Sequence, residues 1–361
     1  MHHRLLIINP GSTSTKIAVF DDDSPLFAET LRHGSADLAR FRNVAAQFAF
    51  RRDLILQALE AHGVPLSSLT AVVGRGGLLR PIPGGTYRVD PAMLRELSEA
   101  RHGEHAANLG ALLAHELAHA AGGVPAFIVD PPVVDELEPV ARLTGLPEMR
   151  RRSAFHALNQ KAVARRAAAD LGRAYADVNL VVVHLGGGVS IGAHRRGRVI
   201  DVNNALDGEG PMSPERAGTV PSLGLVHLAF SWKHTLREIG RMLVGQGGLV
   251  AHVGTNDARK VEERIAAGDE AARLAYTAMA YQVAKEVGRA AVVLGGQVDG
   301  IVLTGGLAHS AMLTGWICEQ VEWIAPVAVY PGEDEMAALA AGALLVLRGE
   351  EPAGAYEEAV E

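Results

Sequence analysis

Residues 5–20 read Leu-Leu-Ile-Ile-Asn-Pro-Gly-Ser-Thr-Ser-Thr-Lys-Ile-Ala-Val-Phe, with two apolar segments on either side of a polar turn. The apolar run 5–8 predicts a buried strand, and 16–20 predicts a second strand that leads into an aspartate run. Between them, residues 9–14 supply the Asn, Pro, Gly and Ser that tight turns favour. The stretch therefore predicts a β-hairpin at the start of an α/β domain.

The same pattern returns near residue 180, with strands at 180–185, 189–194 and 198–202 around a run of glycines. Helical periodicity predicts helices over 53–59 and 104–121 in the first half and over 157–171 and 269–294 in the second. A strand at 300–304 and a final helix at 335–347 complete the pattern. Two hairpins, each opening half of the chain, indicate a duplicated α/β domain.

The composition limits the function classes. The chain has 361 residues, 48% of them apolar, which is enough for one large or two medium cores. A formal charge of −7 argues against a nucleic-acid partner. A single cysteine, Cys318, excludes an internal disulfide and fits a reducing compartment. The longest apolar stretch, 336–347, is shorter than the roughly 20 residues of a membrane span. We expect a cytoplasmic protein that binds neither nucleic acid nor membrane.

The first turn offers groups that bind phosphate. These are an amide, backbone N–H groups, hydroxyls and a cation, from Asn9, Gly11, Ser12, Ser14 and Lys16. An ordinary hairpin turn would look the same, so the residues alone leave both interpretations open. A Walker A loop is excluded, because Thr15 and not glycine precedes the lysine.

Two further glycine turns carry the same ambiguity. His184 ends a predicted strand just before Gly186, Gly187 and Gly188, whose missing side chains let a ligand approach the backbone. The strand 300–304 runs into Gly305-Gly306-Leu307-Ala308, where a helix N-terminus could lie near a nucleotide. Each could also be a plain glycine turn. The hairpin turn at 9–16 and the hairpin turn after His184 together favour a phosphate clamp.

In this order and spacing, Asn9-x-Gly-Ser-Thr-Ser-x-Lys16, His184-Leu-Gly-Gly-Gly and Thr304-Gly-Gly resemble the acetate kinase family. Stretches 73–77, 128–132, 155–160, 207–218 and 331–340 resemble its butyrate kinase branch. The resemblance implies two duplicated RNase H-like α/β domains of the actin-like ATPase type, with a cleft between them. The first domain would span 1–150 with 335–350, and the second 151–334.

The resemblance also implies roles for the matching residues. Arg75 would hold the substrate carboxylate and Arg216 the transferring phosphoryl group, while His184 would hydrogen-bond the same oxygens with support from His156. Asn9, Asp130 and Glu335 would hold Mg²⁺. ATP would bind the first turn, the glycines 186–188 and the adenosine-side turn 305–308.

The implied reaction is butyrate + ATP = butanoyl phosphate + ADP, by direct in-line transfer. A carboxylate is already a nucleophile at pH 7, so no general base is needed and Asp130 is interpreted as a metal and positioning residue. The resemblance further implies a homodimer or larger homo-oligomer, with the second domain the favoured interface. Acetate, propionate and branched-chain acids are the alternative substrates.

Two departures and one glycine bear on specificity. Gln160 stands where acetate kinases carry a second histidine, and Leu307-Ala-His309 replaces their usual Gly-Glu-Asn, which leaves the nucleotide base open. Gly77 stands where acetate kinases have a bulky aliphatic residue, which predicts room for a longer acid, with Phe155 as another wall.

Two other classes compete. His115-Glu-Leu-Ala-His119 matches the zinc-protease pattern H-E-x-x-H, but Pro125 stands where the extended motif has its third histidine. The alternative interpretation of this stretch is an ordinary helix that buries its leucines and leaves its histidines partly solvated. A non-metabolic relative of the same fold, such as an ATPase switch, a filament protein or a repressor, lacks support from any appended segment.

Overall fold

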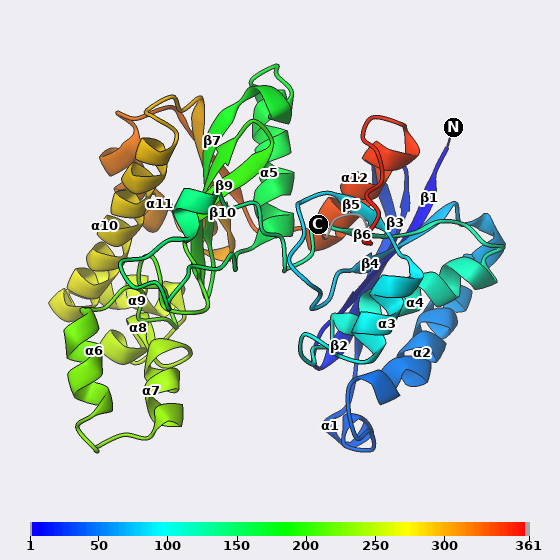
Figure 1. Ribbon diagram of the computed structural model, residues 1–361, viewed down its shortest axis with the longest axis horizontal. Coiled ribbons are helices and arrows are strands. Elements are labelled where there is room, and N and C mark those ends of the chain that lie inside the picture. Colours follow the sequence, from blue (N-terminus) through cyan, green and yellow to red (C-terminus); the bar gives the residue numbers. More distant parts are fainter. Residues whose placement is uncertain (1, 358–361) are drawn as a thin grey trace. The chain divides into compact units, whose positions relative to one another are not determined.

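The computed structural model describes residues 2–357, which form two compact units (Figure 1). The first unit is drawn from both ends of the chain, up to Asp135 and again from Asp334. The second runs from Glu136 to Glu333. Each unit has its own sheet and its own core.

The sheet of the first unit has the strand order β3-β2-β1-β4-β6-β5. Its strands are β1 (Arg4–Pro10), β2 (Ser14–Asp21), β3 (Ser24–Arg32), β4 (Ala71–Arg75), β5 (Thr86–Arg88) and β6 (Ala126–Val129). The predicted hairpin is confirmed, with Ile8 opposite Ile17 in antiparallel register. β1, β4 and β6 run parallel.

Helices cover this sheet. They are α1 (Ser35–Leu38), α2 (Phe48–Ala61), α3 (Pro91–Ser98), α4 (Asn108–Ala120) and α12 (Glu335–Leu347), with 3-10 turns at Ala45–Gln47 and Leu66–Ser68. Leu6 and Ile8 of β1 share one apolar cluster with α2 and α4. α12 packs on β1, β4 and β6. Side chains alternate along a strand, so the intervening Leu5 and Ile7 point to the opposite face, where they are also fully buried.

The sheet of the second unit has the order β11-β10-β7-β8-β9. The strands are β7 (Asn179–Leu185), β8 (Val189–Arg195), β9 (Arg198–Val202), β10 (Gly300–Gly305) and β11 (Val327–Pro331). The second predicted hairpin and its third strand are confirmed as β7, β8 and β9. β7, β10 and β11 run parallel.

The helices of the second unit lie on both faces of its sheet (Figure 1). They are α5 (Ala157–Asp170), α6 (Ser222–Ala229), α7 (Leu236–Leu243), α8 (Gly248–Val253), α9 (Ala258–Ala266), α10 (Glu270–Val293) and α11 (Ala311–Val321), with 3-10 turns at Pro139–Arg142, Tyr175–Asp177 and Gly306–His309. Val181 and Val183 of β7 pack with α10, whereas Leu180 and Val182 pack with α5. The strand is buried on both faces, which explains its unbroken apolar sequence.

The predicted helices were found, with shifted ends. The segment expected at 53–59 begins earlier, as α2, and the one expected at 104–121 begins later, as α4. Asp269 caps α10 by accepting from the N–H of Ala272, as an N-terminal aspartate should. Within the described residues, no helix combines the length and the apolar character that crossing a membrane requires.

A buried ion pair stabilises the start of the second unit. Lys161 Nζ of α5 lies 2.9 Å from both carboxylate oxygens of Glu136, and the two side chains are 3% and 5% exposed. Glu136 also accepts from the N–H of Val199 in β9. The pair therefore joins the first residue of the unit to a helix and a strand.

We expect Lys161→Met to lower the free energy of unfolding by about 3–5 kcal/mol, because it leaves a buried carboxylate without its cation. Urea unfolding measures the change. As a control, Arg173→Met breaks a half-exposed pair with Asp299 and should cost about 1 kcal/mol or less. Equal losses in both variants would contradict this assignment.

Candidate functional site

Three predicted residues of the first unit lie side by side on one edge of its sheet. Asn9 is near the end of β1, Arg75 ends β4, and Asp130 directly follows β6. Ile8 pairs with Gly74, and Arg75 pairs with Val129, so the parallel register places Asn9 and Arg75 at the same level and Asp130 one residue beyond them. The carboxyl edge of a parallel sheet is where α/β folds bind ligands.

Glu335 joins this edge from the far end of the sequence. It is the first residue of α12, and its two carboxylate oxygens accept from Asn9 Nδ2 at 2.7 Å and from Arg75 Nη1 at 2.9 Å. The Arg75 and Glu335 side chains are 18% and 31% exposed, so the pair stays open to a ligand. The structure thus brings three predicted residues into one hydrogen-bonded cluster.

Backbone packing fixes the position of Arg75. A Cβ atom on Gly110 of α4 would lie 2.1 Å from the carbonyl oxygen of Arg75, and one on Gly74 would lie 2.2 Å from that of Gly110. The helix can touch the strand this closely only because both residues are glycines. The main chain beneath the arginine is therefore held rigidly.

Asp130 is buried and held by its surroundings. Its φ of 37° lies in the left-handed region, which is uncommon for a residue other than glycine. Its carboxylate accepts from the N–H of Gly85 at 2.8 Å, and its own N–H donates to the carbonyl of Gly85. Strained backbone of this kind persists where the surrounding structure enforces it.

The predicted magnesium residues have the right chemistry but do not form a preassembled protein cage. Asp130 and Glu335 offer carboxylate oxygens, the ligand type that Mg²⁺ prefers. Among the residues that the structure describes, no group of three or more His, Cys, Asp or Glu side chains could hold a metal. Mg²⁺ usually binds through one or two carboxylates plus substrate phosphates, so the donor set fits that mode.

The first predicted phosphate turn is braced from behind by Arg51, which the sequence analysis missed. This guanidinium of α2 is fully buried and donates to the carbonyls of Gly11 at 2.8 Å and Ser14 at 3.1 Å. It also donates to Thr15 Oγ1 and to Gln47 Oε1. Burial lowers the pKa of Arg51 to about 10. Ser12 and Lys16 remain exposed on the outer side of the turn.

The second glycine turn is surrounded by polar side chains of the second unit. His184 lies on β7, and the guanidinium of Arg216 packs on Gly188, where a Cβ would lie 2.1 Å from Nη1. Ser213 Oγ donates to the carbonyl of Gly187 at 2.6 Å and accepts from the N–H of Arg216. Burial lowers the pKa of Arg216. The turn therefore has a glycine at 188 because the arginine takes the space.

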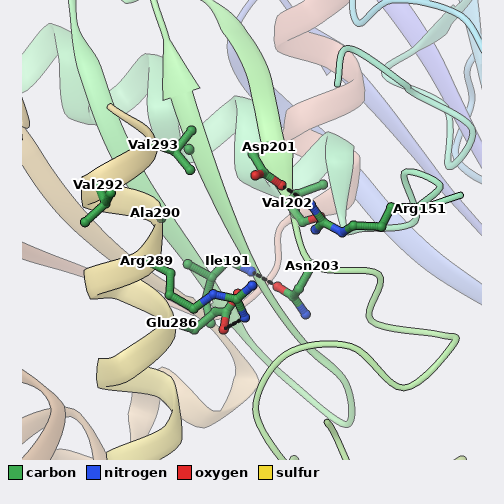
Figure 2. A pocket seen from close by; sticks show the side chains of 11 residues that line it. Arg151, Ile191, Asp201, Val202, Asn203, Glu286, Arg289, Ala290, Val292 and Val293 are labelled. Carbon is green, nitrogen blue, oxygen red and sulfur yellow. Dashed lines mark hydrogen bonds and ion pairs between the residues drawn. The ribbon is translucent and has the colours of Figure 1, made fainter. Parts of the chain in front are cut away.

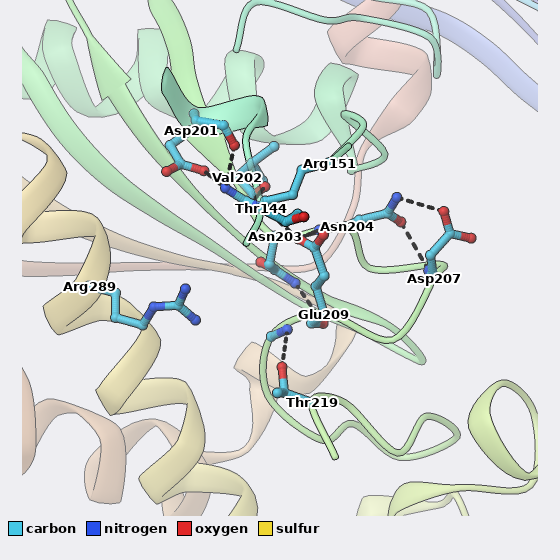
Figure 3. Close-up of polar contacts among 12 residues, drawn as sticks. Thr144, Arg151, Asp201, Val202, Asn203, Asn204, Asp207, Glu209, Thr219 and Arg289 are labelled. Carbon is cyan, nitrogen blue, oxygen red and sulfur yellow. Dashed lines mark hydrogen bonds and ion pairs between the residues drawn. The ribbon is translucent and has the colours of Figure 1, made fainter. Parts of the chain in front are cut away.

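A polar network around Arg151 holds the loop that carries Arg216 (Figure 3). The Arg151 guanidinium donates to Asp201 at 2.9 Å, to Glu209 at 3.1 Å and to the carbonyl of Val202 at 2.9 Å. Asn203 Oδ1 accepts from the N–H of Ile191 on β8. These bonds attach Asn203 and Glu209, in the first part of the loop that leads to Arg216, to the end of the sheet.

His184 and His156 stack, with ring centroids 3.7 Å apart and an interplanar angle of 10°. His184 Nδ1 lies 2.7 Å from Asn159 Oδ1, and His156 Nδ1 lies 2.9 Å from Ser190 Oγ. Gln160 then donates to Ser190 and lies 3.0 Å from His194. Gln160 thus belongs to a buried hydrogen-bond chain that supports the histidine pair.

The third glycine turn differs from the expectation in one respect. Gly305 has φ 91°, and a Cβ there would lie 2.4 Å from the carbonyl oxygen of Leu185, so this turn requires glycine. A 3-10 turn, Gly306–His309, follows β10, and α11 begins only at Ala311. The turn therefore presents short 3-10 backbone, with Ala308 buried, in place of a long helix N-terminus.

The structure explains the glycine at position 77 differently from the sequence analysis, which interpreted Gly77 as room for a longer acid. A Cβ on Gly77 would lie 2.6 Å from the Cα of Asn108, at the start of α4. The missing side chain makes room for a helix, so the structure does not support the interpretation of Gly77 as an opening for an acyl tail. Phe155 is buried beside His156 and is 8% exposed.

The zinc-protease motif lies on the surface of α4. His115, Glu116 and His119 are exposed, whereas Leu113 and Leu117 are buried in the core. This is the amphipathic helix that the alternative interpretation described.

A pocket of about 270 Å³ lies between α10 and strands β8 and β9 (Figure 2). Glu286 and Arg289 form an ion pair on its helical side, and burial raises the pKa of Glu286. No predicted site residue lines this pocket.

The comparisons with known proteins agree with this arrangement. A profile described as the Acetokinase family matches residues 145–325, half of the chain. The structure is similar to acetate kinase from Porphyromonas gingivalis, with TM-score 0.77 and 22% identity over 96% of this chain and 100% of the other. It is also similar to a propionate kinase from Francisella tularensis subsp. tularensis SCHU S4, with TM-score 0.70 and 21% identity over 94% and 98% of the two chains. A ROK family protein from Streptococcus pneumoniae TIGR4 matches with TM-score 0.53 and 12% identity over 96% and 100%. With the two sheets, these likenesses confirm the expected α/β fold class of the actin-like ATPases.

We expect Arg51→Leu to lower the free energy of unfolding by about 2–4 kcal/mol, because several buried acceptors of the first turn lose their donor. Chemical unfolding measures the change. The neighbouring Arg52→Leu is the control, since its side chain is 32% exposed and its ion pairs lie at the surface. A loss no larger than that of Arg52→Leu would refute the bracing role.

Proposed function

The chain belongs to the acetokinase family, and from this premise we propose that it transfers the γ-phosphoryl group of ATP to a short-chain fatty acid, with butyrate as the preferred acid. The reaction is butyrate + ATP = butanoyl phosphate + ADP. Family membership supports phosphorylation of a carboxylate by ATP, and the choice of butyrate is our own inference.

One observation carries the proposal. Arg216 and His184 both lie at the glycine turn 186–188, where backbone and two positively polarised side chains converge. Phosphoryl transfer depends on positioning and on stabilising charge that spreads over the equatorial oxygens. A guanidinium and an imidazole beside exposed backbone are suited to that task.

Arg75 is proposed to bind the acid. Its planar guanidinium can hold both oxygens of a carboxylate, and in the structure it already donates to a carboxylate, that of Glu335. A substrate carboxylate could take the remaining N–H donors. Because Arg75 and Glu335 neutralise each other, the acid would meet a site with one cation and one anion.

The chemistry needs no general base. One oxygen of the acid attacks the γ-phosphorus, the bond from phosphorus to the bridging oxygen of ADP breaks, and ADP leaves with the electron pair. Arg216 and His184 would stabilise the transferring group. Mg²⁺, when bound at Asp130 and Glu335 with Asn9, would neutralise phosphate charge.

The nucleotide is proposed to bind through the glycine turns. Gly305, Gly306, Leu307 and Ala308 would contact its adenosine side, while the first turn, with Ser12, Ser14 and Lys16, would contact phosphate oxygens. Arg51 would act indirectly, by keeping the turn in shape.

The preference for butyrate rests on sequence motifs of the butyrate kinase branch, chiefly 207–218 and 331–340. We expect kcat/KM to rise from acetate to butyrate by about 4-fold per methylene, because each buried CH₂ contributes roughly 0.8 kcal/mol and a tenfold change needs about 1.4 kcal/mol. Trapping the acyl phosphate with hydroxylamine over acids of two to five carbons measures this. A reaction without acid is the control for ATP hydrolysis. If acetate is the best substrate, the proposed preference for butyrate is wrong. If no acid yields hydroxamate, the proposed carboxylate kinase activity is wrong.

We also propose a homo-oligomer that associates through the second unit. Around α6 and α7, Leu223, Phe230, Trp232 and Leu236 are 67%, 73%, 91% and 88% exposed. Exposed apolar clusters of this kind usually mark interaction surfaces. Light scattering should give at least twice the monomer mass of 38.1 kDa, and Phe230→Ser with Leu236→Ser should shift the protein toward monomer. A monomeric wild type contradicts the proposal.

A further inference from the structure

Glu333 is a carboxylate with no role in the proposed reaction, yet it lies at the centre of the second unit's glycine turns. It follows β11, and its position is fixed by Gly332. The N–H of Gly332 donates to the carbonyl of Gly305 at 2.9 Å, and the N–H of Gly305 donates back at 3.2 Å. This pair of bonds places Glu333 beside the third glycine turn.

The carboxylate lies against the second glycine turn. Its Oε1 lies 3.1 Å from Nε2 of His184, on the strand that leads into this turn. A Cβ on Gly186 would lie 3.5 Å from the same Oε1. The side chain therefore lies where His184 and the turn would meet a ligand.

The histidine has only one nitrogen to offer a ligand. Nδ1 faces Asn159 Oδ1 at 2.7 Å, and stacking on His156 fixes the plane of the ring. Only Nε2 remains, and it is already paired with the carboxylate of Glu333. One N–H cannot donate well to a carboxylate and to a phosphoryl oxygen together.

Resting on the proposed function, we propose that Glu333 is an internal stand-in for a nucleotide phosphate oxygen, which must leave His184 before the nucleotide can bind. A carboxylate and a phosphate offer the same chemistry to these donors, namely an anionic oxygen. His184 itself is 1% exposed, but the Glu333 side chain is 38% exposed and can turn into water. The carboxylate keeps the buried His184 donor satisfied without ligand and weakens nucleotide affinity, because its removal is part of binding.

The test is the affinity for ADP, measured by titration calorimetry on the full chain with and without Mg²⁺. Glu333→Gln removes the charge at nearly constant shape. We expect it to lower the Kd for ADP about 10-fold in both conditions, and to lower KM for ATP in the hydroxamate assay by a similar factor. A residue that only stabilised the fold would weaken binding when replaced.

The matched control is Glu215→Gln. Glu215 also lies near the second turn, since a Cβ on Gly187 would be 3.6 Å from its Oε2, but it accepts from Asn256 and not from His184. We expect its replacement to change the Kd by less than about 2-fold, because Glu215 pairs with Asn256 and leaves Nε2 of His184 with its Glu333 partner. An equal gain in both variants would show a general charge effect and overturn the exchange at His184.

Three further outcomes distinguish this inference from its alternatives. If Glu333→Gln weakens ADP binding only in the presence of Mg²⁺, Glu333 is a metal ligand and the inference is wrong. If its ADP affinity equals that of the wild type while hydroxamate still forms, the inference alone fails. If no variant binds ADP and no acid gives hydroxamate, the proposed function fails and takes this inference with it.

Discussion

Parallel pairing ends each set of strands on one edge of its sheet, and the placement of the candidate residues depends on this constraint. In the first unit β1, β4 and β6 deliver Asn9, Arg75 and Asp130 to one edge. In the second unit β7, β10 and β11 deliver His184, Gly305 and the segment leading to Glu333. The register of the strands fixes which residues lie beside one another. Residues far apart in the sequence therefore become neighbours even where their side chains make no direct contact.

The glycines at these edges serve different partners. Gly188 gives its space to the guanidinium of Arg216, Gly305 to the backbone of β7, and Gly77 to the start of α4. The second and third turns are thus packed against protein as well as open to a ligand. A glycine in a sequence shows that space is needed there but does not show what occupies it.

Charge is arranged in the same way in both units. One predicted donor in each unit is held by a carboxylate, Arg75 by Glu335 and His184 by Glu333. A cationic group beside a sheet edge repels its neighbours and loses solvation unless an anion is close. Under the proposed function, such pairing would keep the donors oriented and would make ligand binding an exchange of one anion for another.

The sequence predicted the two hairpins and the long helices, because apolar periodicity and turn residues are local signals. It could not identify Arg51, since a buried guanidinium on α2 looks like any helical arginine until the turn that it braces is in place. Nor could it show that Gly77 faces Asn108, or that Glu333, in a motif already noted, reaches His184. Those facts depend on contacts between distant segments, and only the tertiary structure decides which donor meets which acceptor.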